Sequence, residues 1–373
     1  MALSKNLAKI TAQVQKKYGE SMVSVASETT DRDIVVHPTG SLMIDLALGT
    51  ADRAGIPEGR LMEIYGPESA GKTTVALLMI AARQQEEYQK QLEDPSYQKR
   101  VCVFVDAEHA LDFRLAQEYG VDMNELIYIN PETAEQAMDV LDLYIRSGEV
   151  AIALVDSVPS LVPASVEQAS FEQQHMAVLA RFMSGVCQKL SGPAFQNKTT
   201  VIFINQIREA LGKFSPMGTP ETTPGGRALK FYSTIRMSVR RGDTLKKDGE
   251  QIGHVLRIRV VKNKIAPPFK EATVGLVYGE GVDRADEMFQ IALKAKIIKQ
   301  GGAWYSYVNE DGEVISFRDQ DMKFQGREGM IEAIRTIPEF FGELEDIIRG
   351  VKVEADEMSE EEIEAIKNAE KEK

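Results

Sequence analysis

A phosphate-binding loop is the clearest chemical motif in this sequence. Its residues are Gly66, Pro67, Glu68, Ser69, Ala70, Gly71, Lys72, Thr73 and Thr74. The segment follows a strand-like apolar run and opens a helical pattern, which is the context that the motif requires. The glycines allow backbone N–H groups to surround a phosphate, Lys72 neutralises it, and the Thr73 hydroxyl can bind Mg²⁺. The sequence therefore predicts a site for a nucleoside triphosphate and Mg²⁺.

Acidic residues at the ends of two other apolar runs could complete this site. Asp156 ends the run 151–156, and phosphate-loop enzymes use such a residue to hold Mg²⁺. We prefer this metal role to that of a turn or helix cap. Hydrolysis also needs a carboxylate that orients or deprotonates the attacking water. Glu108, just past the run 103–106, is our choice, although spacing alone makes Asp106 nearly as good.

An unusual loop, residues 207–227, follows the apolar run 200–205 and the amide of Gln206. The loop contains Arg208, Lys213, Phe214, three prolines and four glycines. Loops with a few charges and apolar side chains suit contact with single-stranded nucleic acid. Gln206 could then sense a γ-phosphate and move the loop. A long surface loop capped by an amide explains the same pattern, and the residues alone leave both interpretations open.

The elements that must position these residues alternate between short apolar strands and helices. The expected strands are 61–65, 101–106, 126–129, 151–156 and 200–205. The expected helices between them are 73–89, 133–147 and 176–191. Nearly continuous apolar strands separated by helices are typical of a mostly parallel, doubly wound α/β sheet.

The pattern changes after residue 230. Segments 235–241, 255–262 and 272–278 alternate apolar and polar residues, as antiparallel strands with one wetter face do. A small α+β unit follows, and we expect its aromatic residues, Trp304 included, to lie in its core. At the other end, residues 3–18 predict one amphipathic helix that must dock on something.

The charge is distributed unevenly along the chain. The net charge is −13, but residues 353–373 hold nine acidic and three basic side chains, and residues 227–270 hold three acidic and twelve basic ones. A basic strip on an acidic protein is compatible with binding a polyanion, although a solvated basic surface would look the same. The acidic end predicts a tail without a packed core.

The remaining composition indicates a protein of the cytoplasm. No apolar run has transmembrane length, and the N-terminal residues lack the pattern of a secretory signal. The two cysteines, Cys102 and Cys187, lie in apolar patterns, so we expect buried reduced thiols rather than a disulfide or metal site.

Taken together, these segments resemble the bacterial RecA recombinase family. The resemblance runs from about Thr39 to Tyr307 through the blocks TGSLMIDLALG, EIYGPESAGKTT, VFVDAEHALD, LVDSV, FINQIR, PETTPGGRALKFY, VVKNKIAPPFK, YGEG and GAWYSY. It implies a RecA-type ATPase core that binds ATP and Mg²⁺. It also implies helical filaments on single-stranded DNA, pairing with double-stranded DNA, and strand exchange in recombination and repair.

The resemblance assigns roles to particular residues. Glu108 matches the catalytic glutamate, and Gln206 matches the glutamine that senses γ-phosphate. Lys262 and Lys264 match a pair that reaches the ATP of the neighbouring subunit. The loop 207–227 and the segment 167–181 match the two DNA-contact loops. The implied DNA contacts are Met176, Arg181, Arg208, Lys213, Phe214, Gly225, Gly226 and Arg227.

The same resemblance divides the chain into four parts. These are an N-terminal oligomerisation segment (1–33), the ATPase core (34–282), a small DNA-binding domain (283–352) and an acidic tail (353–373) that competes with DNA. Single-strand-binding protein and the repressor of the DNA-damage response are implied partners. No membrane is expected.

Some features depart from the family. Leu115 stands where a tyrosine commonly stacks on adenine, while Asp112 of the nucleotide site is retained. Residues 84–99 form a longer stretch than usual. These departures suggest a divergent member, of which a phage-encoded protein is one kind. A hexameric helicase and a DNA-coating protein that binds ATP without turnover are the two alternatives.

Overall fold

The computed structural model describes residues 4–19, 22–23, 34–50, 53–167, 176–209, 221–247, 249–309, 311–318 and 320–350. The chain divides into a short unit, Met1–Val35, and a large one, Val36–Lys373. The short unit contains the expected helix, α1 (Lys5–Tyr18). Ser4 caps it by accepting a hydrogen bond from the Leu7 backbone N–H, and no residue of α1 is buried. Its apolar side therefore remains available for docking.

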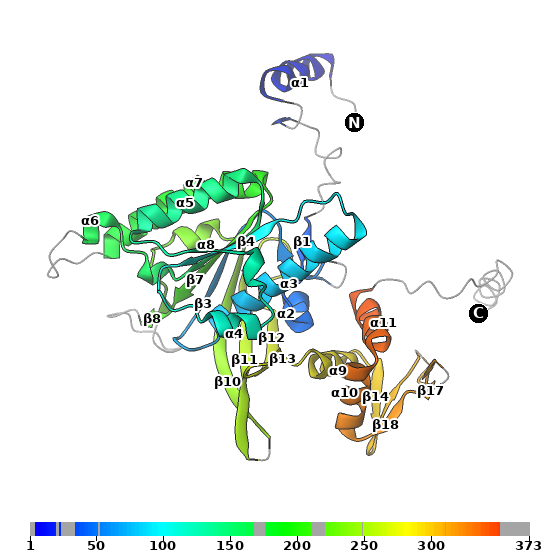
Figure 1. Cartoon of the computed structure of the whole chain (residues 1–373). Helices are drawn as coiled ribbons and strands as arrows, with labels where there is room; N and C mark the ends of the chain where they lie inside the picture. Colours follow the sequence, from blue (N-terminus) through cyan, green and yellow to red (C-terminus); the bar gives the residue numbers. More distant parts are fainter. Residues whose placement is uncertain are drawn as a thin grey trace, which may run out of the picture. The chain divides into compact units, whose positions relative to one another are not determined.

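A nine-stranded sheet organises the large unit (Figure 1). Its order is β13-β12-β11-β10-β3-β7-β6-β4-β5, parallel from β10 to β5 and antiparallel from β10 to β13. The parallel strands are β3 (Leu61–Gly66), β4 (Val101–Asp106), β5 (Leu126–Ile129), β6 (Val150–Asp156) and β7 (Thr200–Gln206). The others are β10 (Ile235–Lys247), β11 (Glu250–Asn263), β12 (Glu271–Val277) and β13 (Gly281–Val282). The predicted strands are confirmed, and β10 and β11 extend beyond their predicted ends into a long hairpin.

Helices cover both faces of this sheet, as predicted for a doubly wound fold. Alternate residues of one strand point to opposite faces, so Val103 and Phe104 of β4 enter different apolar clusters. One cluster packs α2 (Leu42–Leu48) and α3 (Lys72–Glu93), and the other packs α5 (Ala134–Ser147) and α7 (Met176–Gln196) (Figure 1). The shorter elements are β1 (Val36–His37), β2 (Ile56–Pro57), α4 (Phe113–Glu118), α6 (Ala164–Glu167), β8 (Arg208–Glu209), β9 (Glu221–Thr222) and α8 (Ala228–Tyr232).

The small C-terminal part has a third apolar cluster of its own. Its helices are α9 (Arg284–Lys294), α10 (Gly326–Thr336) and α11 (Pro338–Arg349). Its strands are β14 (Ile298–Gly301), β15 (Trp304–Tyr307), β16 (Ser316–Phe317), β17 (Gln320–Asp321) and β18 (Lys323–Gln325). The prediction of a small α+β unit after residue 282 is therefore in agreement with these elements.

The expectation that Trp304 lies in this core is wrong. Tyr305 and Tyr307 of β15 pack against Phe289 and Phe340 of the helices. Because side chains alternate along a strand, Trp304 points to the other face, where it is 43% exposed. The Lys323 ammonium lies 5.6 Å from its ring centroid.

Two contacts fasten the small part to α2. The Glu287 carboxylate of α9 accepts hydrogen bonds from the Ser41 hydroxyl and from the Leu42 backbone N–H at 2.9 Å. It thereby caps the N-terminus of α2. Burial raises the pKa of Glu287 to about 7. On α11, Arg349 donates to Asp45 of α2 at 3.2 Å.

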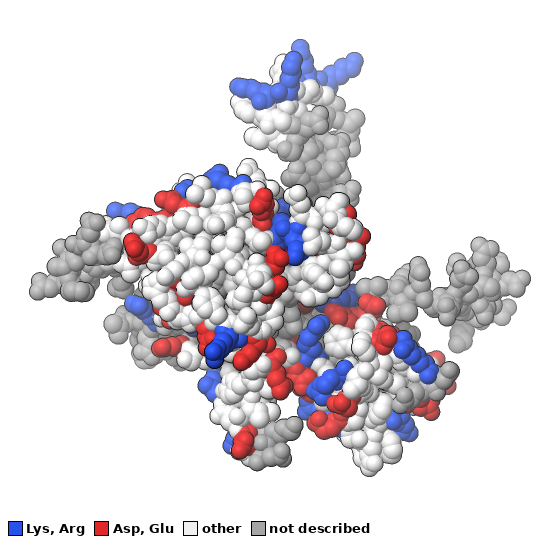
Figure 2. All heavy atoms as spheres, viewed as in Figure 1, with Lys and Arg blue, Asp and Glu red and all other residues white. Residues whose placement is uncertain are grey.

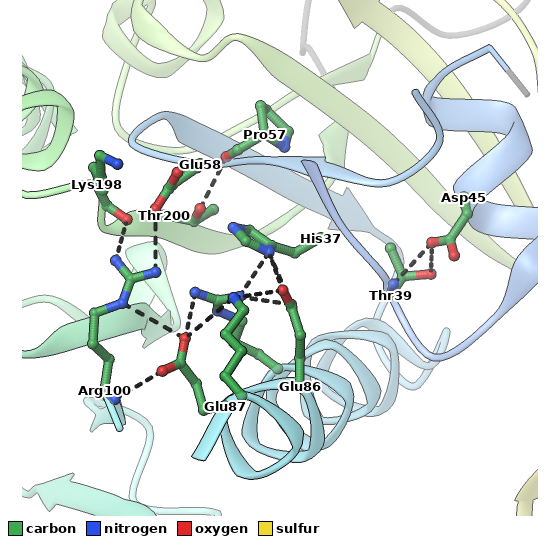
Figure 3. A network of polar contacts seen from close by, with 12 residues as sticks. His37, Thr39, Asp45, Pro57, Glu58, Glu86, Glu87, Arg100, Lys198 and Thr200 are labelled. Carbon is green, nitrogen blue, oxygen red and sulfur yellow. Dashed lines mark hydrogen bonds and ion pairs between the residues drawn. The ribbon is translucent and has the colours of Figure 1, made fainter. Parts of the chain in front are cut away.

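The longer stretch 84–99 extends α3 and carries a buried ionic cluster (Figure 3). Arg83, 1% exposed, pairs with Glu86 and Glu87 at 2.6 Å each. His37 of β1 lies 2.8 Å from Glu86, and Arg100 donates its backbone N–H to Glu87 and pairs with Glu58. We name His37, Glu58, Arg83, Glu86, Glu87 and Arg100 the far-end cluster. Glu58 and Arg100 precede β3 and β4, so it lies at the amino ends of the parallel strands.

Candidate nucleotide and DNA site

The phosphate-binding loop joins β3 to α3 at the carboxyl ends of the strands. Gly71 has φ +89°, and a Cβ on it would lie 2.6 Å from the Leu256 side chain. A Cβ on Gly66 would lie 2.0 Å from the Val239 carbonyl oxygen. Both positions therefore require glycine. Lys72 is buried and donates to the Pro67 carbonyl at 2.6 Å. Burial lowers the pKa of Lys72, and nearby acids oppose that shift.

Thr73 and Asp156 meet directly beside Lys72. The Thr73 hydroxyl donates to Asp156 Oδ2 at 2.6 Å, and Asp156 is 7% exposed. Burial raises the pKa of Asp156 to about 6, despite the Thr73 hydrogen bond and the Lys72 charge. Two hard oxygen ligands suit Mg²⁺, which takes its other ligands from water and phosphate. The described residues contain no group of three or more His, Cys, Asp or Glu side chains that could hold a metal ion.

The structure separates the roles of Asp106 and Glu108. Asp106 is buried and accepts hydrogen bonds from the backbone N–H groups of Ala110 and Leu111 and from the Tyr128 hydroxyl. Its oxygens therefore shape the loop after β4. Glu108 is exposed and accepts one hydrogen bond, from the Ser157 hydroxyl at 3.1 Å. Only Glu108 combines an accessible carboxylate with a position beside Asp156, whose carbonyl accepts the Glu108 backbone N–H at 3.2 Å.

Gln206 lies between the phosphate-binding loop and the long loop that follows. It is paired with Gly66 across β3 and β7, and the next backbone N–H, of Ile207, donates to the Gly66 carbonyl at 3.1 Å. Buried Asn205 donates to the Pro224 carbonyl at 3.1 Å, at the far end of the loop. Gln206 and its neighbours therefore connect the phosphate-binding loop, at Gly66, to both ends of the long loop, at Ile207 and Pro224.

The residues of the two DNA-contact segments fall partly within the described structure. Arg208 opens the long loop on β8, which pairs with β9, and Arg208 and Arg227 are exposed. Lys213 and Phe214 lie outside the described residues. Gly225 and Gly226 have positive φ and approach α7, where a Cβ on Gly226 would lie 2.8 Å from Ala180.

Helix α7 carries the described end of the other predicted DNA-contact segment, 167–181. Met176 is its first residue, and Arg181 is exposed one turn further on. The Gly225-Gly226 end of the long loop therefore lies against the helix that carries Arg181. A cavity of about 430 Å³ separates the loop from the segment after β6.

Lys262 and Lys264 lie together on the carbonyl end of α8. Lys262 donates to the carbonyls of Lys230 and Phe231 at 2.7 and 2.9 Å, and Lys264 reaches the Phe231 carbonyl at 3.4 Å. Burial lowers the pKa of Lys262 to about 8, and the Lys264 charge adds to this effect. Within the described residues, these bonds go to α8 and none goes to the phosphate-binding loop.

The two residues assigned to the adenine end lie on α4. Asp112 is the N-cap of α4 and accepts hydrogen bonds from the backbone N–H groups of Arg114 and Leu115 at 2.9 and 3.2 Å. Leu115 packs against the apolar cluster under α3. Leu115 thus has a packing role that needs no aromatic ring.

A basic groove on β10 and β11 was not assigned to the site from the sequence. A cavity of about 390 Å³ is lined by Arg240, Arg257 and Arg259. The residue count of the basic strip pointed to this region, but only the strand pairing shows that the three guanidinium groups share one face. Elsewhere, basic side chains gather on α1, and basic and acidic ones are mixed on the small C-terminal part (Figure 2).

A parallel sheet with this loop, a strand-end acid and an accessible carboxylate defines a phosphate-loop ATPase. The family model described as RecA N-terminal domain matches residues 5–283. Curated relatives named Protein RecA include that of Bacillus pumilus, 41% identical over 94% of this chain and 96% of its own length. The Oceanobacillus iheyensis protein is 42% identical over 94% of each chain. The Bacillus subtilis protein is 45% identical over 80% of this chain and 81% of its own length.

The chain belongs to the RecA family. It is therefore an ATP-dependent homologous recombinase that forms filaments on DNA and exchanges strands in recombination and repair. It is a DNA-dependent ATPase that uses ATP with Mg²⁺. This membership sets aside the helicase and the DNA-coating protein. No helix in the described part of the chain is long and apolar enough to cross a membrane.

Proposed function

We propose that Lys72, Thr73, Asp156, Glu108 and Gln206 form the centre that couples ATP hydrolysis to DNA binding. Lys72 and the loop N–H groups hold the β- and γ-phosphates. Glu108 orients a water for in-line attack on the γ-phosphorus and accepts its proton as the P–O bond to ADP breaks. Thr73 and Asp156 would hold Mg²⁺, which would supply neutralisation of charge on the phosphate oxygens.

The observation that carries this proposal is the contact between Thr73 and Asp156 at 2.6 Å, with Glu108 bonded to the adjacent Ser157. These contacts bring together two candidate Mg²⁺ ligands and an accessible base, at or just beyond the carboxyl ends of β3, β6 and β4. Gln206 lies opposite Gly66 at the start of the same loop. The γ-phosphate can therefore bias the DNA-contact loop through Gln206.

The first test is ATP hydrolysis with and without single-stranded DNA, in the wild type and in Lys72→Ala. We expect strong stimulation by DNA in the wild type. We expect a loss of about 100-fold or more in the variant, since a charge on the transferring phosphate is removed. Turnover that does not respond to DNA would contradict the coupling through Gln206.

DNA contacts are proposed in two places on the core. Arg181, Arg208 and Arg227, with Met176, Gly225 and Gly226, flank the loop that would meet a single strand, and Lys213 and Phe214 belong to the same loop. Exposed guanidinium groups can neutralise phosphates there. The groove of Arg240, Arg257 and Arg259 is proposed to bind a second polyanion, the incoming strand or duplex. That polyanion would replace the Asp243 and Glu271 carboxylates, which pair with Arg257 and Arg259 at 2.8 and 3.5 Å.

The small domain is the proposed capture site for double-stranded DNA. Trp304 and Lys323 lie together on its exposed sheet face. An aromatic ring beside a cation can contact sugar or base while the charge meets phosphate. The acidic tail, 353–373, would compete with DNA for basic side chains such as Lys323, so its deletion should tighten binding of duplex DNA.

Lys262 and Lys264 are proposed to act on the ATP of a neighbouring subunit. Their paired ammonium groups lie at the exposed end of α8 beside Phe231, which is 68% exposed. A cation that arrives from the next subunit stabilises charge on the transferring phosphate and so links hydrolysis to filament assembly.

We also propose the limits of the domains and two specific protein partners. We divide the chain into segments 1–33, 34–282, 283–352 and 353–373. Helix α1, with exposed Leu7 and Ile10, would dock on an adjacent subunit. Single-strand-binding protein and the damage-response repressor are proposed partners. A cytoplasmic location is supported by Cys102 and Cys187, which are free and buried.

A further inference from the structure

Glu63 of β3 is a fully buried carboxylate outside the proposed ATP centre. Its side chain is 0% exposed, and each of its two oxygens accepts a hydrogen bond from a different strand. Oε1 accepts from the Asn205 amide of β7 at 2.9 Å, and Oε2 accepts from the Arg236 guanidinium of β10 at 2.5 Å. A buried carboxylate is costly unless it is paired and hydrogen-bonded. Glu63 therefore needs both partners, and it ties β7 to β10 through β3.

The Asn205 side chain joins this carboxylate to both parts of the proposed DNA response. Its amide nitrogen donates to Glu63 and also to the Pro224 carbonyl, at the end of the long loop. Its amide oxygen accepts the backbone N–H of Gln206 at 2.9 Å. Because the nitrogen faces two acceptors and the oxygen faces a donor, the amide has one orientation. Glu63 therefore fixes the group that joins Gln206 to the end of the loop.

Arg236 connects the same carboxylate to the lysine pair. Across the sheet, Lys262 of β11 pairs with Arg236, and Arg236 pairs with Glu63. Residues directly opposite each other point to the same face of a sheet, so these three side chains form one row. The Arg236 guanidinium also lies over the Tyr65 ring, 4.7 Å from its centroid, which limits its movement. The row ends at Lys262, whose ammonium lies on the carbonyl end of α8.

The carboxylate also offsets the repulsion between the cations of this row. Burial is the main cause that lowers the pKa of Lys262, and the Lys264 and Arg236 charges lower it further. The Glu63 charge acts in the opposite direction and raises that pKa. If Glu63 were neutral, the Arg236 guanidinium would repel the Lys262 ammonium without compensation. The carboxylate thus allows two cations to lie side by side on neighbouring strands.

We propose that Glu63 is a positioning residue that connects the DNA-contact loop of one subunit to the ATP of the next. One carboxylate oxygen holds Asn205, and with it the Pro224 end of the loop, while the other holds Arg236 beside Lys262. A shift of this loop end reaches the lysine pair through three hydrogen bonds and the cross-strand pair. This inference rests on the proposed roles of the loop and of Lys262. It differs from the route through Gln206, which stays within one subunit.

The first test measures ATP hydrolysis by full-length Glu63→Gln with and without single-stranded DNA. A glutamine has one oxygen for two donors, so one of the two links is lost whichever way its amide turns. The ratio of DNA-stimulated to DNA-free turnover should fall about 3- to 30-fold. Glu87→Gln is the matched control, since it also neutralises a buried carboxylate that is paired with an arginine. Its ratio should equal that of the wild type.

A second variant keeps the test valid if Glu63→Gln folds poorly. In Glu63→Met combined with Arg236→Met, two apolar side chains replace the buried ion pair, and such replacements are often neutral or stabilising. Methionine also packs well against an aromatic ring such as that of Tyr65. This double variant should fold and should show the same fall in the ratio.

Mixed filaments test whether the effect passes to the next subunit. Glu108→Gln keeps Glu63 and Lys262, and we expect it to bind ATP with very slow hydrolysis. In a mixture, its lysine pair serves the ATP sites of neighbouring Glu63→Gln subunits. Turnover per Glu63→Gln subunit should therefore rise as the share of Glu108→Gln increases. Turnover per wild-type subunit in mixtures of the same proportions should not rise.

The outcomes separate this inference from the functions on which it rests. A wild-type ratio in Glu63→Gln or in the double methionine variant would overturn the positioning role of Glu63. An equal fall in Glu87→Gln would also overturn it, because the loss would then follow from any broken buried ion pair. If turnover did not rise in the mixed filaments, the connection to the next subunit would be wrong. A wild type whose turnover does not respond to DNA would instead contradict the proposed coupling centre.

Discussion

Two groups of charged side chains lie at opposite ends of the parallel strands, and the pKa values of their carboxylates shift in opposite directions. In the far-end cluster, burial alone would raise the pKa of Glu87. The Arg100 backbone N–H and the Arg83 charge outweigh it and hold that pKa below its usual value. The hydrogen bond with His37 and the Arg83 charge likewise outweigh burial and lower the pKa of Glu86. These carboxylates find their partners within the protein.

At the nucleotide end, burial prevails over the partners. The pKa of Asp156 rises to about 6 and that of Lys72 falls, even though the two charges are close. Each of the two groups has a hydrogen-bond partner, yet burial governs both shifts, and Mg²⁺ and phosphate would favour the charged forms. Strongly shifted groups of this kind are typical of functional sites. Carboxylates whose pKa is lowered by partners within the protein therefore fit a structural role, whereas groups whose pKa shift is governed by burial fit a ligand site.

The largest expected effect breaks the nucleotide end alone. Glu108→Gln keeps the shape of the side chain and removes the base, so kcat should fall by about 10²- to 10⁴-fold while ATP still binds. Steady-state hydrolysis with single-stranded DNA measures this.

Asp106→Asn is the matched control two residues earlier. Asp106 shapes its own loop through Ala110 and Leu111, so this variant should lose far less turnover. Equal losses in the two variants would remove the distinction that we draw between the carboxylates.

The second effect breaks the far-end cluster. Glu87→Gln leaves Arg83, 1% exposed, without one of its two carboxylate partners. Removing one member of a buried ion pair costs about 3 kcal/mol of unfolding free energy. Urea denaturation measures it, and turnover per folded molecule should stay unchanged.

Glu93→Gln, on the same helix, provides the control. Glu93 is exposed, so its substitution should change stability by less than about 0.5 kcal/mol. If both variants behaved alike, the far-end cluster would contribute no more than a surface charge.

The sequence was sufficient for the parallel strands because each reads as a nearly continuous apolar run, and β3, β4, β6 and β7 are almost entirely buried. It was also sufficient for the phosphate-binding loop, whose glycines serve close approaches such as that of Gly71 to Leu256. These features depend on local sequence and on one repeated packing pattern.

Features that depend on contacts between distant residues could not be predicted. Spacing could not separate Asp106 from Glu108, because the difference lies in the bonds from Ala110, Leu111 and Tyr128. Trp304 was assigned to the core on residue type, whereas the alternation of β15 places it outside.

The smallest expected effect is that of substituting Glu287. This residue is hydrogen-bonded within the protein like the far-end carboxylates, but burial raises its pKa as it does for Asp156. It is buried and well hydrogen-bonded to the start of α2, yet burial raises its pKa to about 7. An acid with a raised folded-state pKa stabilises the fold below its unfolded value of 4.5, and this contribution is lost as the pH rises through 7. The loss should be on the order of 2–3 kcal/mol.

Glu287→Gln removes the titration and keeps an acceptor for the Leu42 N–H. As the pH rises from 4.5 to 7.5, the variant should therefore become more stable relative to the wild type. Urea midpoints at several pH values would show this. Glu345→Gln, which changes an acid paired with Arg349, is the control and should show a flatter difference. A Glu287 difference that does not vary with pH would group this carboxylate with Glu86 and Glu87 of the far-end cluster, whose partners keep them ionised.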